Sequence, residues 1–241
     1  MKFERDLILS ASRKSWKMSS THGTEFDKEY KDSKGNPGKN KKVWDDVWAR
    51  DKHKCYYCGF ESKRHQEIHH LNDDHSDNSM DNLVTICPLC HQNFHLDTAS
   101  TTNGGKIIWL PEFSQQELNY LSRAIFVAIE EAESKENENS EVSGFIKIAR
   151  MLENSLSERA LIVEQQIQNS SSDPSIFANA LINMTDAQYE KRFGFLKPFK
   201  LLNLRSRFPI QTKYWKNSTF KDIPVNTWEK LIIKKVNVEK T

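Results

Sequence analysis

The sequence predicts an α+β fold in which a zinc-stabilised module is followed by a mainly helical region and a basic C-terminal extension. Three observations support this prediction. All four cysteines form two CxxC pairs between residues 55 and 90, apolar residues recur at helical spacing between residues 111 and 192, and thirteen lysines and arginines follow residue 190. These transitions divide the chain into four expected parts: 1–42, 43–110, 111–192 and 193–241.

The first expected part joins a partly alternating stretch to a polar linker. Four large apolar residues alternate in part with polar ones, which predicts a strand or two packed on the core: Phe3, Leu7, Leu9 and Trp16. A Gly-Asn-Pro-Gly sequence at residues 35–38, with three lysines beside it, then indicates a turn or linker. These lysines could contact phosphates, although such a run is more often a solvated linker.

The four cysteines predict a structural zinc site. Cys55 and Cys58 form one CxxC pair, and Cys87 and Cys90 form the second, which is the spacing of a closed tetrahedral site. Two disulfides are the alternative. Because CxxC pairs bridge poorly and the N-terminus lacks a secretory pattern, we expect Zn²⁺ rather than disulfides.

A second group of metal-binding side chains lies within the same module. Residues 67–70 read as a strand that ends in two histidines, and residues 83–86 form another apolar run. His91 directly follows the last cysteine and His95 comes four residues later, which places both imidazoles on one face of a helix. With His69 they would give one metal ion three nitrogen ligands and leave positions open for water and substrate.

This order of strand, loop, strand and helix, carrying His, Asn and His, resembles the HNH, or ββα-metal, endonuclease family. Residues 43–51 look like the helix that usually leads into that module. The resemblance implies that His70 is the general base and that Asn82 orients it. It also implies a divalent metal ion of open identity at the catalytic site, bound by His69, His91 and His95.

The residue types suit the cleavage of phosphodiester bonds that this resemblance implies. An imidazole titrates near neutral pH, so His70 could take a proton from the attacking water while a metal ion stabilises charge on the phosphate and the leaving oxygen. DNA is the expected substrate. Each histidine also has a structural alternative, as a surface strand residue or as a solvent-facing residue of a short helix.

A loop, a strand and a long helix are expected after the histidines. Small polar residues at positions 98–105 predict a loop, and the run Lys-Ile-Ile-Trp-Leu at residues 106–110 predicts a strand. Ser114 and Glu117 have the spacing of a capping box, and apolar residues at helical spacing extend the predicted helix from about residue 115 to residue 132.

Three further helices are expected in the mainly helical region. An apolar face between residues 146 and 167 predicts an amphipathic helix. Asp173 and Pro174 cap a short helix through residue 182, and another short helix is expected at about residues 186–192. Residues 111–170 carry eleven acidic and five basic side chains, so an apolar or acidic face here could also bind a partner.

The C-terminal region is basic and poorly periodic. Residues 191–241 hold thirteen lysines and arginines against three acids, interleaved with aromatic residues such as Phe208, Trp215 and Trp228. Such a stretch could follow a phosphate backbone and stack on bases. The alternative, which is the more common one, is a small packed region with an aromatic core and solvated lysines.

From about residue 43 to residue 184 the chain is also similar to the IcmJ/DotN family of type IVB secretion and conjugation systems. The matching stretches are residues 55–60, 82–85, 110–129 and 172–177. The resemblance implies an HNH-like fold that serves as a zinc-stabilised subunit of the cytoplasmic coupling complex, without a need for the catalytic histidines. In this chain those histidines are present.

Composition narrows the classes of function. With 37% hydrophobic and 28% charged residues and no long apolar run, we expect a cytoplasmic protein without membrane insertion or a small-molecule cofactor. Three hypotheses follow. The chain is a metal-dependent HNH endonuclease acting on DNA, a non-catalytic adaptor that binds type IVB coupling-complex proteins, or a DNA-binding module without chemistry.

Overall fold

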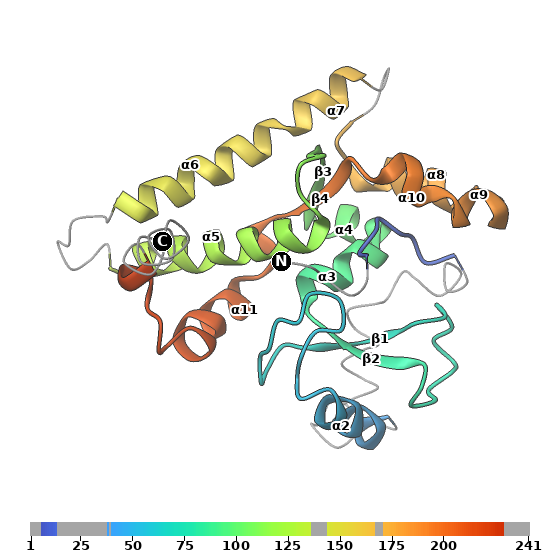
Figure 1. Ribbon diagram of the computed structural model, residues 1–241, viewed down its shortest axis with the longest axis horizontal. Coiled ribbons are helices and arrows are strands. Elements are labelled where there is room, and N and C mark those ends of the chain that lie inside the picture. Colours follow the sequence, from blue (N-terminus) through green and yellow to red (C-terminus); the bar gives the residue numbers. More distant parts are fainter. Residues whose placement is uncertain (1–5, 14–37, 39, 136–143, 167–170, 229–241) are drawn as a thin grey trace, which may run out of the picture.

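The computed structural model describes residues 6–13, 38, 40–135, 144–166 and 171–228. Within these residues helices surround two separate antiparallel sheets of two strands each, so the expected α+β class is confirmed (Figure 1). Buried apolar side chains form three clusters here, and the largest includes all four cysteines. The cysteines are therefore part of the main core rather than of a peripheral knuckle.

A strand hairpin with a helix on either side forms the N-terminal module. Its elements are α2 (Lys41–Arg50), β1 (Glu67–His70), β2 (Leu83–Ile86), α3 (Pro88–His91) and the 3-10 helix η2 (Gln92–Phe94). The strands pair antiparallel, with Glu67 opposite Ile86 and His70 opposite Leu83. Helix α2 buries Trp44 against this hairpin, so the amphipathic stretch ahead of the first cysteine gains its stability from tertiary packing.

Helix α4 (Leu96–Thr101) occupies part of the segment in which the sequence predicted a loop. Residues 98–105 have no helical periodicity of their own, but Leu96 and Ala99 are fully buried and α4 packs against α8 (Pro174–Ile182). Packing between distant segments therefore overrides the weak local preference. The loop prediction was wrong for residues 98 to 101.

The second sheet joins strands that are far apart in the chain. β3 (Gly105–Trp109) pairs antiparallel with β4 (Phe199–Asn203), with Ile107 opposite Leu201. The first of these strands was predicted to within one residue. The second was not predicted, because a five-residue strand inside an aperiodic basic stretch carries no signal that distinguishes it from a loop.

Helix α5 (Gln115–Lys135) runs through the middle of the molecule (Figure 1). It begins at the predicted capping box, in which Ser114 Oγ donates to Glu117 Oε2 at 2.7 Å and Glu117 N donates to Ser114 Oγ at 3.2 Å. The side-chain amide of Gln115 also donates to and accepts from the backbone of Leu201, each at 2.9 Å. Since α5 also contacts α3, it connects the N-terminal module to the second sheet.

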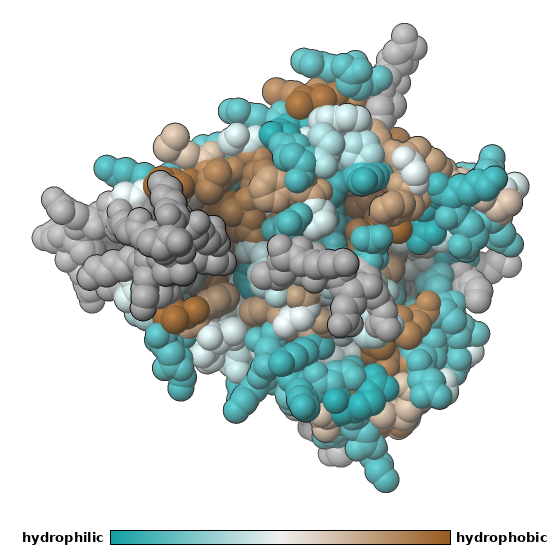
Figure 2. Space-filling view, in the orientation of Figure 1, coloured by the Kyte–Doolittle hydropathy of each residue, from teal (hydrophilic) through white to brown (hydrophobic). Residues whose placement is uncertain are grey.

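The amphipathic helix predicted at residues 146–167 is broken into α6 (Gly144–Glu158) and α7 (Ala160–Gln166). The break lies at Arg159, whose carbonyl accepts a hydrogen bond from Trp109 N at 3.4 Å and whose Nη1 donates to Trp109 O at 3.3 Å. Helix α6 lies beside α5, and brown residues gather where the two helices meet on the face shown in Figure 2. None of the helices in the described part of the chain combines the length and apolarity that a membrane crossing requires.

The C-terminal part is a series of short elements packed on α5 and β3. After α8 come α9 (Asp186–Glu190), α10 (Arg192–Leu196), the 3-10 helix η4 (Arg205–Arg207), α11 (Pro209–Tyr214), the π-helix η5 (Trp215–Thr219) and the 3-10 helix η6 (Val225–Thr227). Asp173 caps α8 as predicted, accepting from Ser175 N at 2.7 Å. Phe208 and Trp215 belong to the main core, which agrees with the packed alternative for the basic region.

Residues 6–13 lie against the fold without forming a strand. Leu7 and Leu9 are buried as the alternation predicted, and Ser10 N donates to Asn93 O at 2.8 Å. The prediction of a strand is therefore not met in these residues. Its other two apolar positions, Phe3 and Trp16, lie outside the described residues.

Candidate functional site

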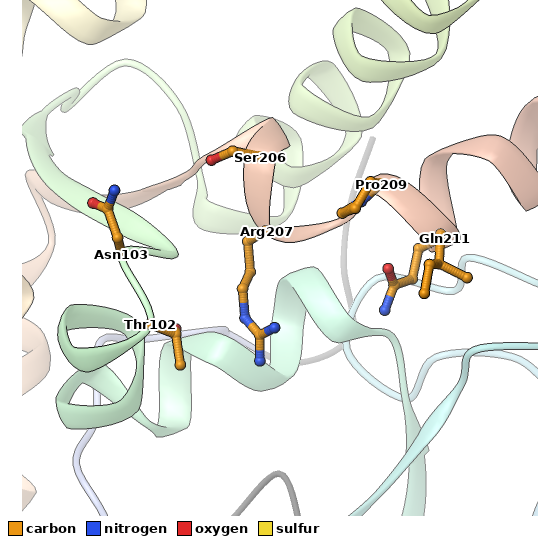
Figure 3. Close-up of a pocket in the computed structure, with 7 residues that line it drawn as sticks. Thr102, Asn103, Ser206, Arg207, Pro209 and Gln211 are labelled. Carbon is orange, nitrogen blue, oxygen red and sulfur yellow. The ribbon is translucent and has the colours of Figure 1, made fainter.

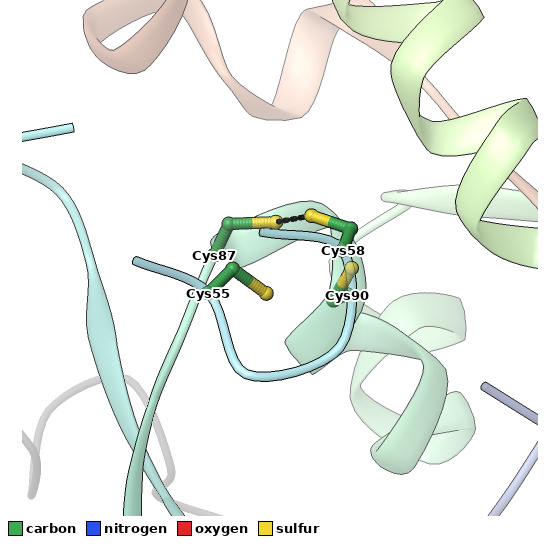
Figure 4. Close-up of side chains that lie close together, drawn as sticks. All are labelled: Cys55, Cys58, Cys87 and Cys90. Carbon is green, nitrogen blue, oxygen red and sulfur yellow. Dashed lines mark hydrogen bonds between the residues drawn. The ribbon is translucent and has the colours of Figure 1, made fainter. Parts of the chain in front are cut away.

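The four cysteines converge on one buried point (Figure 4). Cys55 and Cys58 lie in the turns ahead of β1, and Cys87 and Cys90 lie at the start of α3. Their sulfur atoms all lie within 4.8 Å of one another, and each residue is at most 3% exposed. The Sγ atoms of Cys58 and Cys87 are 3.7 Å apart, whereas a disulfide bond measures about 2.05 Å. All four cysteines are free of disulfides, and their geometry fits four thiolates around one tetrahedral metal ion.

A tight turn and a helix start position these sulfur atoms. Cys55 N donates to Phe60 O at 2.9 Å, and Gly59 N donates to Cys55 O at 2.7 Å. Gly59 has a φ of +73°, a left-handed conformation that glycine adopts without steric cost. The second pair is fixed by α3, whose N-cap residue is Cys87.

Three side chains of α5 contact this cysteine cluster. Arg123 Nη2 donates to Cys87 Sγ at 3.2 Å, Asn119 Nδ2 donates to Cys90 Sγ at 3.3 Å, and the Tyr120 hydroxyl donates to the carbonyl of Cys58 at 2.5 Å. Arg123 is 1% exposed, and its Nε and Nη1 find no hydrogen-bond acceptor among the described residues. A guanidinium so deeply buried requires a nearby negative charge, and the cysteine sulfurs supply it.

The electrostatics of the cysteine cluster divide it into two kinds of thiol. The hydrogen bond from Cys55 is the largest of the influences that hold the pKa of Cys58 well below its usual value. Burial raises the pKa of Cys87 and Cys90 well above theirs. Burial acts to lower the pKa of Arg123, but the charge of Cys87 and the other sulfurs raises it overall. A metal ion bound by all four sulfurs must therefore displace protons from the two most buried thiols.

The structure also brings together the three histidines that the sequence singled out as metal ligands. His69 lies on β1, His91 ends α3 and His95 follows η2, and one nitrogen from each lies within 4.8 Å of the others. The Nε2 atoms of His91 and His95 are 3.1 Å apart. Two nitrogen ligands of one tetrahedral ion lie about 3.3 Å apart, given metal–nitrogen bonds of about 2.05 Å. The sequence predicted that His91 and His95 share one face of a single helix. In the structure, the α-helix α3 ends at His91 and the 3-10 helix η2 lies between the two histidines.

Hydrogen bonds on the outer ring nitrogens orient two of these histidines. Glu67 Oε2 lies 2.6 Å from His91 Nδ1, and Ser12 Oγ lies 2.7 Å from His95 Nδ1. These contacts direct the Nε2 atoms of His91 and His95 toward the point on which the three histidines converge. The hydrogen-bond partners of metal-bound imidazoles act in the same way. Burial holds the pKa of His69 well below its usual value, so this ring is neutral at pH 7, the form that binds metal.

His70 and Asn82 lie near this histidine group but are engaged with the loop that joins β1 to β2. His70 Nε2 lies 3.2 Å from Asn78 Oδ1, and the ring stacks on His75 with centroids 4.8 Å apart. Asn82 Oδ1 accepts from the backbone of Asn72 at 3.0 Å, and its Nδ2 donates to the carbonyl of Asp77 at 2.8 Å. The Asn82 side chain thus holds the loop between the strands.

Sequence reasoning missed the residues that support both groups of ligands. Arg123, Asn119, Glu67 and Ser12 were not singled out, although one of them carried a signal. Arg123 is the single charged residue in the stretch Leu-Ser-Arg-Ala-Ile-Phe-Val-Ala-Ile, and a cation on the apolar face of a helix indicates a buried partner. Ser12 had no such signal, because its contact with His95 spans 83 positions of the chain.

Comparison with known proteins identifies a relative that covers most of the chain. No protein-family model matches the chain. Type 4 apparatus protein DotN of Legionella pneumophila subsp. pneumophila (strain Philadelphia 1) is 32% identical over 179 residues, which cover 73% of this chain and 79% of that protein.

This relationship corrects one expectation and confirms another. The expectation that the chain is an HNH endonuclease is wrong, because the relative is named as a type 4 apparatus protein and not as a nuclease. The comparison likewise gives no support to DNA as a partner. The expected likeness to the IcmJ/DotN family is confirmed by the identity and the coverage of the match. The chain therefore belongs to the IcmJ/DotN family.

Proposed function

We propose that this chain is a non-catalytic, zinc-stabilised adaptor subunit of the cytoplasmic coupling complex of a type IVB secretion or conjugation system. The observation that carries the proposal is the match to type 4 apparatus protein DotN, which covers 73% of this chain and 79% of that protein. Two features of the structure support it: the way the cysteine cluster is joined to α5, and the apolar surface of α6 and α7.

A zinc ion at the cysteine cluster would stabilise the helical region through α5. Arg123 and Asn119 donate to cysteine sulfurs from one side of this helix, while α6 packs along it. Loss of the ion would leave Arg123 buried beside Cys87 and Cys90, whose raised pKa favours the neutral thiol, and this is unfavourable for a charge in the core. The metal site is thus suited to holding a binding surface in place rather than to reacting.

The outer face of α6 and α7 supplies such a surface. Five large apolar side chains on it are at least 36% exposed: Ile148, Met151, Leu152, Leu161 and Ile162. Ile148, Met151 and Leu152 follow one another at i, i+3 and i+4, so they form a stripe on one side of α6. An exposed stripe of this kind is typical of a helix that binds another protein.

Purification of a tagged chain from its own host tests the adaptor function. A coupling ATPase and its associated apparatus proteins should be recovered, and His70→Ala should leave this recovery unchanged. Replacing Ile148 and Met151 with Asp should abolish it, whereas Lys147→Asp, on the same exposed turn, should not. The proposal fails if no apparatus protein is recovered, or if deletion of the chain leaves secretion and transfer intact.

We further propose that His69, His91 and His95 bind a second divalent metal ion with a structural role. The convergence of their nitrogens within 4.8 Å supports it, as do the partners of the outer nitrogens, Glu67 and Ser12. Three imidazoles favour a transition metal over Mg²⁺. Metal analysis of the purified chain should give two ions, and one after His91→Ala, with His65→Ala as the control. A single ion in the unsubstituted chain, bound by the cysteines, would exclude this site.

A further inference from the structure

A hollow of about 500 Å³ lies between the end of α4 and the turn that carries η4 into α11 (Figure 3). Six labelled side chains line it: Thr102, Asn103, Ser206, Arg207, Pro209 and Gln211. Its volume is within the range of pockets that bind small ligands or the side chains of a peptide. None of its lining residues belongs to the cysteine group or to the histidine group.

Arg207 is the single charged residue of this hollow. Its exposed guanidinium makes no ion pair, hydrogen bond or ring contact with any residue that the structure describes. Arg205, two positions earlier, differs in this respect, because its guanidinium binds both carboxylate oxygens of Glu133 at 2.8 and 2.9 Å. A partnerless arginine in a hollow is a candidate anion site, since a guanidinium binds a carboxylate with two parallel hydrogen bonds.

The other lining residues specify what kind of anion fits. The side chains of Asn103, Ser206 and Gln211 form no hydrogen bond within the described residues, so their donors are available beside Arg207. On one side the wall is apolar, formed by Pro209 and by Ile210, which is 69% exposed. A ligand with a carboxylate next to an apolar group would satisfy both sides of the hollow.

Both edges of the hollow are held rigidly. Asn103 has a φ of +48°, and the next residue, Gly104, donates its N–H to Ala99 O at 2.7 Å and accepts at its carbonyl from Gln92 Nε2 at 2.8 Å. On the other edge Phe208 is buried and stacks with Phe126, their centroids 6.3 Å apart. Donors on a rigid frame lose little entropy when a ligand binds.

A neighbouring hollow favours a peptide over a long polyanion. This second hollow, of about 300 Å³, shares Ser206 and Pro209 with the first. Its charged lining residues are Glu130, Glu153 and Arg205, and the charge of Arg205 is already paired with Glu133. A nucleic acid strand that placed a phosphate at Arg207 would bring further phosphates toward the carboxylates of Glu130 and Glu153, which repel them. A peptide with one or two acidic side chains avoids this repulsion.

We propose that the hollow beside Arg207 binds an acidic side chain, together with its apolar neighbour, from a peptide segment of a partner protein. The identification of the occupant as a partner protein rests on the proposed adaptor function. The carboxylate pairs with Arg207, and the apolar neighbour packs on Pro209 and Ile210.

Titration of the ¹⁵N-labelled full chain with the peptide Gly-Ser-Glu-Leu-Glu-Ser-Gly tests this site by NMR. Shifts are expected at residues 102–103 and 206–211, including the side-chain amides of Asn103 and Gln211. Arg207→Gln should weaken the affinity about tenfold, which corresponds to one charge-assisted hydrogen-bonded pair. Arg205→Gln, the matched control with the same loss of charge, should change it by less than about twofold because that arginine is already paired.

Three results would overturn the assignment. The peptide with Gln in place of Glu could bind equally well, Arg205→Gln could weaken binding as much as Arg207→Gln, or a single-stranded oligonucleotide could bind more tightly through Arg207. Co-purification separates this proposal from the adaptor function. If apparatus proteins are recovered but the peptide does not bind, this hollow is not the site. If the peptide binds but no apparatus protein is recovered, the site stands and the adaptor function fails.

Discussion

Arg123 Nη2 lies 3.2 Å from Cys87 Sγ, so a cation from the centre of α5 contacts the first cysteine of the second CxxC pair. Four thiolates around a Zn²⁺ ion would leave an excess negative charge in the core, and the guanidinium would offset part of it. The remaining faces of Arg123 meet aromatic rings, with its Cζ 3.7 Å from the centroid of Phe60 and 5.4 Å from that of Trp215. The cysteine cluster and the helical region are therefore connected through one side chain.

Substitution of Arg123 should weaken zinc binding without removing a ligand. We expect Arg123→Met to lower zinc affinity about 10- to 100-fold, the usual effect of removing a side chain that contacts metal ligands. Competition with a chromophoric chelator measures this, and the Co²⁺–thiolate absorption reports whether four sulfurs still bind. Arg159→Met, which removes a partly exposed arginine, is the control. Equal zinc affinity in Arg123→Met and the unsubstituted chain would refute the coupling.

Removal of the cysteine-bound metal should unfold the N-terminal module. We expect a chelator, or Cys90→Ser, to lower Tm by more than about 10 °C, because a structural zinc ion contributes directly to folding. Thermal melts followed by circular dichroism test this. The chelator should have little further effect on Cys90→Ser, and an unchanged melt for either Cys55→Ser or Cys90→Ser would contradict the prediction.

Ser12 should affect the second metal ion alone. Its hydroxyl lies 2.7 Å from His95 Nδ1, so Ser12→Ala removes a hydrogen bond that orients the imidazole. We expect the affinity of the histidine group for a divalent metal to fall about tenfold, with no change at the cysteine cluster. Calorimetric titration of the zinc-loaded chain measures it, and Ser10→Ala in the same segment is the control. If both variants lost the same metal affinity, the substitutions would act by disturbing residues 6–13 and not through the hydrogen bond to His95.

Stability should rise with pH above about 8 because of Lys200. Burial lowers the pKa of this lysine to about 8 from 10.5, against the opposing influence of Glu112. Between these two values the unfolded chain binds more protons than the folded one, so the free energy of unfolding increases with pH in this window. Denaturation with urea at pH 7, 8, 9 and 10 should show the rise.

The matched control for this pH dependence is the exposed Lys197. Lys200→Met should abolish the rise and stabilise the chain below pH 8, where the buried ammonium is unfavourable. Lys197→Met should leave the rise in place. A stability that is flat from pH 8 to pH 10 in the unsubstituted chain would refute the assignment to Lys200.

Local sequence signals predicted the grouping of the four cysteines and of the three histidines, and the boundaries of β1, β2 and α8. The CxxC pairs, the capping box at Ser114 and Glu117 and the cap at Asp173 each depend on residues within a few positions of one another, and the structure contains each of them. The convergence of His69, His91 and His95 was likewise visible, because a strand, a hairpin and one helical turn separate them. Features of this kind can be predicted from the sequence because residues that are close together in the chain determine their geometry.

Contacts between segments that are far apart in the chain could not be predicted from the sequence. Strand β4 is defined by its partner β3, α4 by its packing against α8, and the role of Arg123 by cysteines that lie at least 33 positions earlier. The residue types of a nuclease also did not reveal the function, since the match to an apparatus protein contradicts the enzyme expectation. Side chains with the right spacing define a possible site, and its chemistry depends on what surrounds them.

The pairing of β3 with β4 sets a limit on how the chain folds during synthesis. Residues 105–109 leave the ribosome long before residues 199–203, so β3 has no partner strand until most of the polypeptide has been made. Until then the backbone hydrogen-bonding groups along the edge of β3 can pair with other chains. The side-chain amide of Gln115, in the first turn of α5, likewise lacks its partner Leu201. Folding of the second sheet is consequently a late step, and a chain that stops before residue 199 would keep an unpaired strand.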